Sequence, residues 1–216
     1  MRADNQLMTE DRTTYHHGKL REAALAAARV IVEEQGHDAL SMRELAEKIK
    51  VAPSALYRHF SNRIDLLMAI ANETHRELGL ELSEAVAAHS DPWDALETAC
   101  HSYLSFSLAN PSLFRMMYDP ELMAAPDADA RLDAQQAAYG VLLELFHRAL
   151  PNAPPAQLRL RMVSVWSTLY GYASTQANRI LHGYMKEGLT NQEMERAVLA
   201  AALRRPAGAG RGVRTD

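Results

Sequence analysis

The segment 41–67, SMRELAEKIKVAPSALYRHFSNRIDLL, constrains this chain more than any other part of its sequence. Ser41 precedes an apolar stripe at helical spacing, and Glu44 follows three residues later, which is the pattern of a capping box. Pro53 ends the first helix and suits the first turn of another. Asn62 then precedes a third, longer helix. Two short helices joined by a tight turn predict a helix-turn-helix, whose second helix enters the major groove of DNA.

Composition predicts an all-α fold. Hydrophobic residues make up 48% of the 216 residues, Ala, Leu, Glu and Arg are frequent, and the alternation typical of strands is absent. A single cysteine, Cys100, excludes an internal disulfide and suits a reducing compartment. The sequence has no signal-peptide core, and no apolar run approaches the roughly 18–20 residues that span a bilayer. We therefore expect a cytoplasmic protein with no membrane segment.

Charge is divided unevenly along the chain. Residues 12–63 contain nine lysines and arginines and six acidic residues, a formal charge of +3 within a chain of net charge −4. The sign favours contact with phosphates by the N-terminal part alone. A chance fluctuation remains the alternative interpretation.

The individual residues of the motif also resemble those of a known family. The segments 42–46 (MRELA) and 55–60 (ALYRHF), with Val51, Arg63 and the pair Leu66-Leu67, closely resemble the DNA-binding domain of TetR-type transcriptional regulators. The resemblance implies a three-helix domain with a helix-turn-helix, followed by a larger helical domain for ligand binding and dimerisation, with about nine helices in all. It also implies a ligand-responsive repressor that binds a palindromic DNA operator as a dimer.

The candidate DNA contacts follow from position in the motif and from the resemblance. The exposed N-terminal face of a recognition helix meets base edges, while neighbouring side chains hold phosphates. Arg63 matches the family's phosphate-contacting lysine, and Arg43 matches a position that reaches guanine. The predicted DNA-binding residues are Lys19, Ser41, Arg43, Pro53, Ser54, Ala55, Tyr57, Arg58, His59 and Arg63. The alternative is that Tyr57 belongs to the core and that Arg43 is a solvated charge.

Two residues depart from the family pattern. Lys50 replaces the usual glycine of the turn, and Ala52 replaces the Ser or Thr that usually caps the recognition helix. A non-glycine at positive φ and a missing cap each cost about 1 kcal/mol. These departures keep an alternative open, namely a helical ligand-binding or interaction protein that has lost sequence-specific DNA binding.

The predicted organisation has four parts. Residues 1–14 form a flexible arm, 15–63 the DNA-binding domain, 64–205 the effector-binding and dimerisation domain, and 206–216 a disordered tail. Proline and glycine punctuation predicts helices from Asn62 to about His89, from Pro92 to Asn110, over 130–150, from about Ala156 to His182, and after a capping box at Thr190 and Glu193.

The predicted effector cavity has walls of methionine and aromatic residues. Methionine is unbranched and adapts to varied shapes, and no charged residue belongs to the set, so a small, neutral, mostly apolar effector is expected. The candidates are Cys100, Tyr103, Leu104, Met116, Met117, Met123, Tyr139, Phe146, Met162, Trp166 and Tyr170. The alternative for each is a place in the ordinary core.

The C-terminal helices predict a homodimer. Residues 165–183 resemble a subgroup with a Trp-x-x-x-His-Gly signature, although Tyr170 stands at the histidine position before Gly171. Small residues there allow close approach of another helix, so we expect a two-fold four-helix interface through the last two helices. No nucleophile, phosphate-loop or metal-ligand motif occurs, so neither an enzyme nor a metal or cofactor is expected.

Overall fold

The computed structural model describes residues 4–125 and 133–204, with side chains from Lys19 onward, and every regular element in these ranges is helical. The predicted all-α fold is therefore confirmed. The N-terminal part contains α1 (Asp4–Gln35), the short 3₁₀-helix η1 (His37–Ala39), α2 (Met42–Lys48) and α3 (Pro53–Leu56). The remaining elements are α4 (Arg63–Ala87), α5 (Pro92–Ala109), α6 (Pro111–Met117), α7 (Pro120–Met123), α9 (Asp133–Ala149), α10 (Pro155–Ala177), η2 (Gly183–Met185) and α11 (Asn191–Ala202). The predicted tail lies outside the described residues.

The predicted helix starts are present with their caps. The Ser41 hydroxyl accepts a hydrogen bond from the Glu44 N–H at 3.4 Å, and the Asn62 side chain accepts one from the Asp65 N–H at 2.9 Å. Thr190 and Glu193 form the complete capping box. Each bond satisfies a backbone donor that a helix start leaves unpaired.

Two helix boundaries differ from the prediction. The first helix begins at Asp4, so it runs through most of the segment 1–14, for which the sequence predicted a flexible arm. Extending an existing helix fixes one residue per hydrogen bond, so no apolar periodicity is required. At the other end of the chain, α10 ends at Ala177 and not at His182. Arg179 adopts a positive φ of 54°, and the Ile180 N–H donates to the Thr175 carbonyl at 2.9 Å, which closes the helix.

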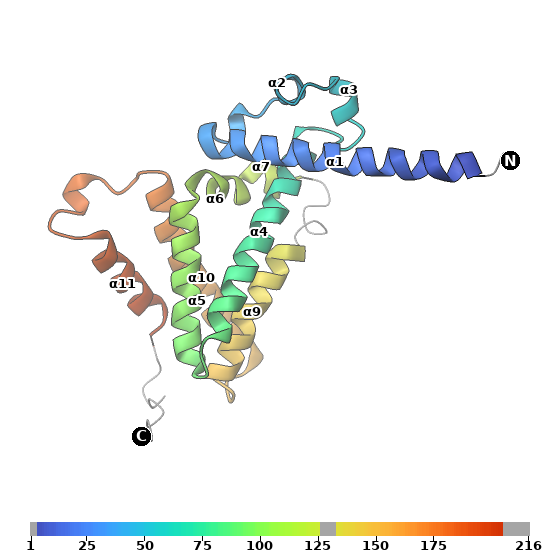
Figure 1. Cartoon of the computed structure of the whole chain (residues 1–216). Helices are drawn as coiled ribbons and strands as arrows, with labels where there is room; N and C mark the ends of the chain where they lie inside the picture. The colour runs from blue at the N-terminus through green and yellow to red at the C-terminus, as the bar shows by residue number, and fades with distance from the viewer. Residues whose placement is uncertain (1–3, 126–132, 205–216) are drawn as a thin grey trace.

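The buried side chains form two apolar cores, and α4 belongs to both. Its first turns place Leu66, Leu67 and Ile70 in the core beneath α1, α2 and α3, which we call the head core. Its later turns place Leu78 and Leu82 in the core of the larger domain, which we call the bundle core. Figure 1 shows α4 running from the N-terminal helices into the bundle beside α5 and α9. A boundary at residue 63 therefore cuts through shared packing.

Helix α6 also contributes to both cores. Leu113 and Met116 belong to the head core, whereas Phe114 and Met117 belong to the bundle core. Leu122 of α7 also belongs to the head core. The N-terminal domain, which we call the head, is therefore covered by α4, α6 and α7 together. No helix in the described part of the chain is long and apolar enough to cross a membrane.

Candidate DNA interface and effector cavity

The turn between α2 and α3 forms with a lysine at its left-handed position. Lys50 has φ 59°, and its N–H donates to the Glu47 carbonyl at 3.1 Å. The Val51 N–H donates to the Ala46 carbonyl at 2.9 Å, so both bonds of a Schellman motif are present. The replacement of glycine thus leaves the turn geometry intact.

Helix α3 begins without a side-chain cap. Ala52 is its N-cap residue and offers no acceptor, but Pro53 at the first helical position has a preset φ and needs no partner for an N–H. Leu56 and Phe60 are buried in the head core, and the Phe60 N–H donates to the Leu56 carbonyl at 3.0 Å. These two apolar anchors hold α3 against the head.

The structure exposes most of the predicted DNA contacts. Tyr57 is 53% exposed, so its alternative assignment to the core is wrong, whereas Leu56 beside it is completely buried. Figure 1 shows α2 and α3 at one end of the molecule, with α1 between them and the bundle. The exposed members of the predicted set are Lys19, Arg43, Pro53, Ser54, Tyr57 and Arg58, and the partly buried ones are Ser41, Ala55, His59 and Arg63.

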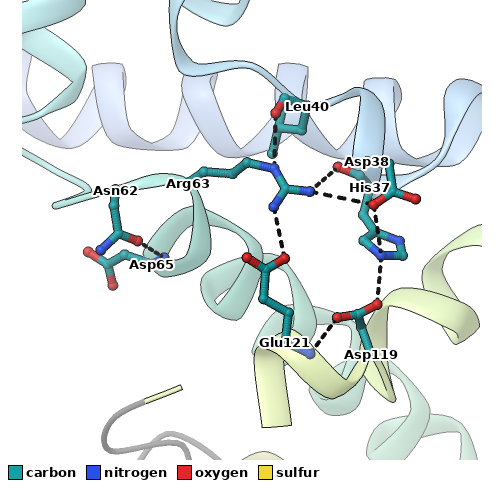
Figure 2. A network of polar contacts seen from close by, with 8 residues as sticks. All are labelled: His37, Asp38, Leu40, Asn62, Arg63, Asp65, Asp119 and Glu121. Atoms are coloured by element: carbon teal, nitrogen blue, oxygen red, sulfur yellow. Dashed lines mark hydrogen bonds and ion pairs between the residues drawn. The ribbon is translucent and has the colours of Figure 1, made fainter. Parts of the chain in front are cut away.

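Arg63 is bound within the protein and does not point freely to solvent. Its Nη2 donates to the His37 carbonyl at 2.8 Å and its Nε donates to the Leu40 carbonyl at 3.1 Å (Figure 2). Its Nη1 donates to the Glu121 carboxylate at 3.2 Å. In this structure the guanidinium joins the loop after α1 to α7, and its contact with a phosphate stays a prediction.

A second contact runs parallel to that of Arg63. His37 Nε2 lies 3.0 Å from Asp119 Oδ2, and Asp119 Oδ1 also accepts a hydrogen bond from the Glu121 N–H at 2.8 Å, which caps α7 (Figure 2). We call His37, Arg63, Asp119 and Glu121 the interdomain cluster. It joins the head to α7 of the larger domain, and nothing local in the sequence marks it, because its partners are up to 82 residues apart.

A cavity of about 170 Å³ lies in the larger domain. Its walls come from α4, α5, α9 and α10 and from the residue that follows α6. The lining residues are His75, Leu78, Leu82, Tyr103, Tyr118, Gln135, Ala138, Tyr139, Leu142, Met162, Val163 and Trp166. Tyr139 and Trp166 are also partly exposed, so the cavity reaches the surface between α9 and α10.

Only part of the predicted effector set lines this cavity. Tyr103, Tyr139, Met162 and Trp166 do so. The others lie elsewhere: Cys100, Leu104, Met117 and Phe146 in the bundle core, Met116 in the head core, Met123 exposed on α7, and Tyr170 against Trp166. Seven of the eleven predicted residues thus do not line this cavity, because helical spacing identifies a buried face without showing where a void remains within it.

Two of the lining residues missed by the sequence prediction had a local signal. His75 shares one face of α4 with Leu78 and Leu82, at the spacing of three and four residues that places side chains together. Tyr118 follows the buried pair Met116 and Met117 at the end of α6. A polar or amphipathic residue within an apolar stripe is the feature that distinguishes both.

The cavity walls are electrically neutral. None of the described lining residues is acidic, lysine or arginine. Burial lowers the pKa of His75 to about 4, so the imidazole is uncharged at neutral pH. Burial also raises the pKa of Tyr103 and of Tyr118, whose hydroxyl oxygens lie 3.5 Å apart. Both phenols are therefore neutral.

Aromatic rings form one wall of the cavity. The Trp166 ring stacks on Tyr170 with centroids 5.2 Å apart and an interplanar angle of 14°. Tyr118 meets Tyr170 and Phe114 in edge-to-face contacts, with ring centroids 4.9 Å and 5.1 Å apart. Tyr118 thereby connects the cavity wall to Asp119, the next residue, which belongs to the interdomain cluster.

An exposed helix-turn-helix on a head domain, joined to a helical domain with a cavity, defines a DNA-binding regulator of the one-component type. Family comparison agrees with this class. Residues 24–70 match the model of bacterial regulatory proteins of the tetR family, and residues 96–201 match the tetracyclin repressor-like C-terminal domain. The chain belongs to the TetR family, whose members are DNA-binding transcriptional regulators and not enzymes. The comparisons do not identify the Trp-His-Gly subgroup.

Curated relatives are similar over about two thirds of their length. The transcriptional activator FasR of Mycolicibacterium smegmatis is 23% identical over 142 residues, which are 65% of this chain and 64% of that protein. The transcriptional repressor KstR of Mycobacterium tuberculosis is 24% identical over 150 residues, 69% of this chain and 67% of that protein. Both an activator and a repressor thus occur among similar proteins.

Solved structures share the fold over most of the chain. A protein of unknown function from Rhodococcus sp. RHA1 is 29% identical, with a TM-score of 0.72, and the match covers 88% of this chain and 96% of that one. BioQ, solved with its double-stranded DNA operator, is 17% identical with a TM-score of 0.59, and the match covers 86% and 98% of the two chains.

Proposed function

We propose that this protein is a ligand-responsive transcriptional repressor that binds a palindromic operator as a homodimer in the cytoplasm. The observation that carries the proposal is the double role of α4. Arg63 and Leu66 at its start belong to the head, and His75, Leu78 and Leu82 line the cavity fewer than six turns further on. A molecule in the cavity therefore touches the same helix that supports the DNA-binding head.

The operator contacts are assigned to the exposed side of α2 and α3. Arg43, Ser54, Tyr57 and Arg58 are exposed there, and Lys50 adds a positive charge on the connecting turn. Base edges are read by side chains on the recognition helix, and arginine and lysine supply most phosphate contacts. The ordered turn supports DNA binding over the alternative of an interaction protein that has lost it.

The dimer interface is assigned to α10 and α11, which pack on one another. Leu160 is 72% exposed and Val163 is 55% exposed on α10, an apolar surface that a single chain leaves uncovered. Further along α10, a Cβ atom added at Gly171 would meet nothing within 4 Å, which leaves space for a partner helix. A two-fold axis here places two heads on one face of DNA, at half-sites roughly 34–36 Å apart or a multiple of that distance.

The effector is assigned to the cavity, and its binding is coupled to the head by two routes. One is α4 itself, because His75, Leu78 and Leu82 belong both to the cavity wall and to the helix that continues into the head core. The other is Tyr118, whose neighbour Asp119 contacts His37. A shift of α4 or of Tyr118 reorients the head relative to the head of the other protomer. A change of a few ångströms in the distance between the two heads prevents both from binding DNA at once.

Fluorescence anisotropy with the DNA upstream of the gene tests this function at two salt concentrations. We expect tight, salt-sensitive binding that Tyr57→Ala weakens by at least tenfold. Tyr184→Ala is the matched control, because Tyr184 is 77% exposed and lies in η2, far along the chain from the head. Binding no tighter than that of a random duplex, followed by no enriched fragment in a genome-wide selection, would favour the interaction-protein alternative.

A further inference from the structure

His75 is an unusual residue to find in the wall of an apolar cavity. Its side chain is 1% exposed, and its Nε2 atom is buried without a hydrogen-bond partner among the described residues. Leaving a buried polar atom unpaired is unfavourable, so such atoms in folded proteins call for an explanation. A ligand that supplies the missing hydrogen bond is one, because His75 lines the cavity.

The composition of the walls favours a ligand with an aromatic ring. Trp166 lines the cavity and is held in a stack with Tyr170, and Tyr118 presents an edge to the His75 ring at 87° with centroids 6.2 Å apart. Aromatic side chains interact with other rings by offset stacking or edge-to-face contact, beyond the gain from burying area. Leu78, Leu142 and Met162 complete an apolar lining around them.

The volume of the cavity suits a ligand of about one ring. The cavity measures about 170 Å³. An engineered apolar cavity of about 150 Å³ in another protein binds benzene. The space here is slightly larger, which accommodates a benzene ring with one small substituent.

The neutral lining selects against ions. No described lining residue carries a charge at neutral pH that would offset the desolvation of a carboxylate or an ammonium group. A neutral imidazole offers one donor and one acceptor nitrogen, according to its tautomer. A hydroxyl group both donates and accepts, so it pairs with Nε2 in either case.

We propose that the effector is a neutral single-ring aromatic compound with a hydroxyl group, a simple phenol in chemical class, whose hydroxyl bonds to Nε2 of His75. The proposal rests on the proposed function, because it names the class of molecule that the regulator senses. His75 is the polar anchor, and Trp166, Tyr118 and the aliphatic residues enclose the ring.

Isothermal titration calorimetry on the full chain tests the proposal with four probes: phenol, toluene, cyclohexanol and benzoate. We expect phenol to bind about tenfold more tightly than toluene, which lacks the hydroxyl, and more tightly than cyclohexanol, which lacks the aromatic ring. Benzoate should bind most weakly because its charge is desolvated without a partner. Equal affinities for phenol and toluene, or preferred binding of cyclohexanol or benzoate, would overturn the proposal.

Substitution of the anchor sharpens the test. His75→Leu should remove the preference for phenol over toluene, whereas His89→Leu should keep it, because His89 lies beyond the end of α4 and contacts Thr98 at 2.9 Å. Retention of the full preference in His75→Leu would contradict the assignment. Thermal unfolding shows whether each variant folds, and if His75→Leu does not, the four-probe comparison on the wild type still decides.

Operator binding measured on the same preparation separates this proposal from the regulator function. A protein that binds its operator but shows no preference for phenol retains the proposed function and loses this inference. A protein that binds phenol through His75 and binds no operator keeps the cavity assignment and loses the regulator function. A protein that does both should release the operator when phenol is added.

Discussion

The head core and the bundle core are packed from different types of residue. The head core contains one aromatic residue, Phe60, among aliphatic residues and methionines, and its members come from α1, α2, α3, α4, α6 and α7 and from the segments between them. The bundle core contains Trp93, Tyr103, Phe114 and Phe146, and beside it lies a cavity with an unpaired histidine nitrogen in its wall. From this difference we expect the head to hold one shape and the bundle to adjust around a ligand.

The largest expected difference concerns two leucines of α4. Leu67 is completely buried in the head core, whereas Leu78, also buried, lines the cavity. Leu67→Ala should lower the free energy of unfolding by about 3–5 kcal/mol, and Leu78→Ala by about 2–3 kcal/mol, because a residue beside a void loses fewer contacts. Urea denaturation of both variants measures the difference, and equal losses would refute the contrast between the two cores.

The next effect is a pH dependence of the free energy of unfolding, which comes from His75 in the cavity wall of the bundle. Burial lowers the pKa of His75 to about 4, below the ordinary value of 6.5. Between these values the unfolded chain binds a proton that the folded chain does not, so the free energy of unfolding falls as pH drops from about 6.5 to about 4. The loss is on the order of 3 kcal/mol. Denaturation of wild type and His75→Leu across this range checks it, since the difference between the two should change with pH and a constant difference would exclude His75 as the cause.

The interdomain cluster makes a smaller contribution to the free energy of unfolding. Substitutions in it also distinguish a structural role of Arg63 from a role in phosphate binding. Arg63→Ala should lower the free energy of unfolding by about 1–3 kcal/mol, because it removes charge-assisted bonds to two partly buried carbonyl groups. Glu121→Gln should lower it by less than about 1 kcal/mol, because Glu121 is exposed. Both variants should leave the salt dependence of operator binding unchanged. A salt slope reduced by about one in Arg63→Ala alone would instead restore its predicted role as a phosphate contact.

The smallest effect tests the turn of the head. Lys50→Gly should raise the free energy of unfolding by about 1 kcal/mol, because glycine adopts φ 59° without the steric cost of a side chain. Lys48→Gly, within α2, should lower it by about the same amount. Thermal unfolding of the two variants provides the measurement, and shifts of the same sign would contradict the geometry of the turn.

Local signals in the sequence predicted the parts of the fold that depend on neighbouring residues. The Ser41, Asn62 and Thr190 caps and the proline that opens α3 act within four residues, so their outcome follows from spacing. The family resemblance already placed Lys50 at the glycine position, but only its positive φ and the hydrogen bonds of the formed turn show that the turn keeps its geometry.

The site depends on distant packing, which spacing does not reveal. Met116 and Met117 are consecutive and both buried, yet one lies in the head core and the other in the bundle core. The role of Arg63 depends on Glu121, which is 58 residues away. The domain boundaries and the DNA contacts of the individual residues stay predictions.

The central claim is that the cavity and the head are coupled through α4 and Tyr118. Ala138→Met tests it most directly, because Ala138 lines the cavity on α9 and faces Gly79 of α4, and a methionine there fills the space without touching the head. Gly140→Ala is the control on the same helix, at a position where an added Cβ meets nothing within 4 Å. We expect Ala138→Met to weaken operator binding at least fivefold, the lower end of typical allosteric coupling, and Gly140→Ala to leave it unchanged. Unaltered operator affinity in a folded Ala138→Met protein would contradict the account.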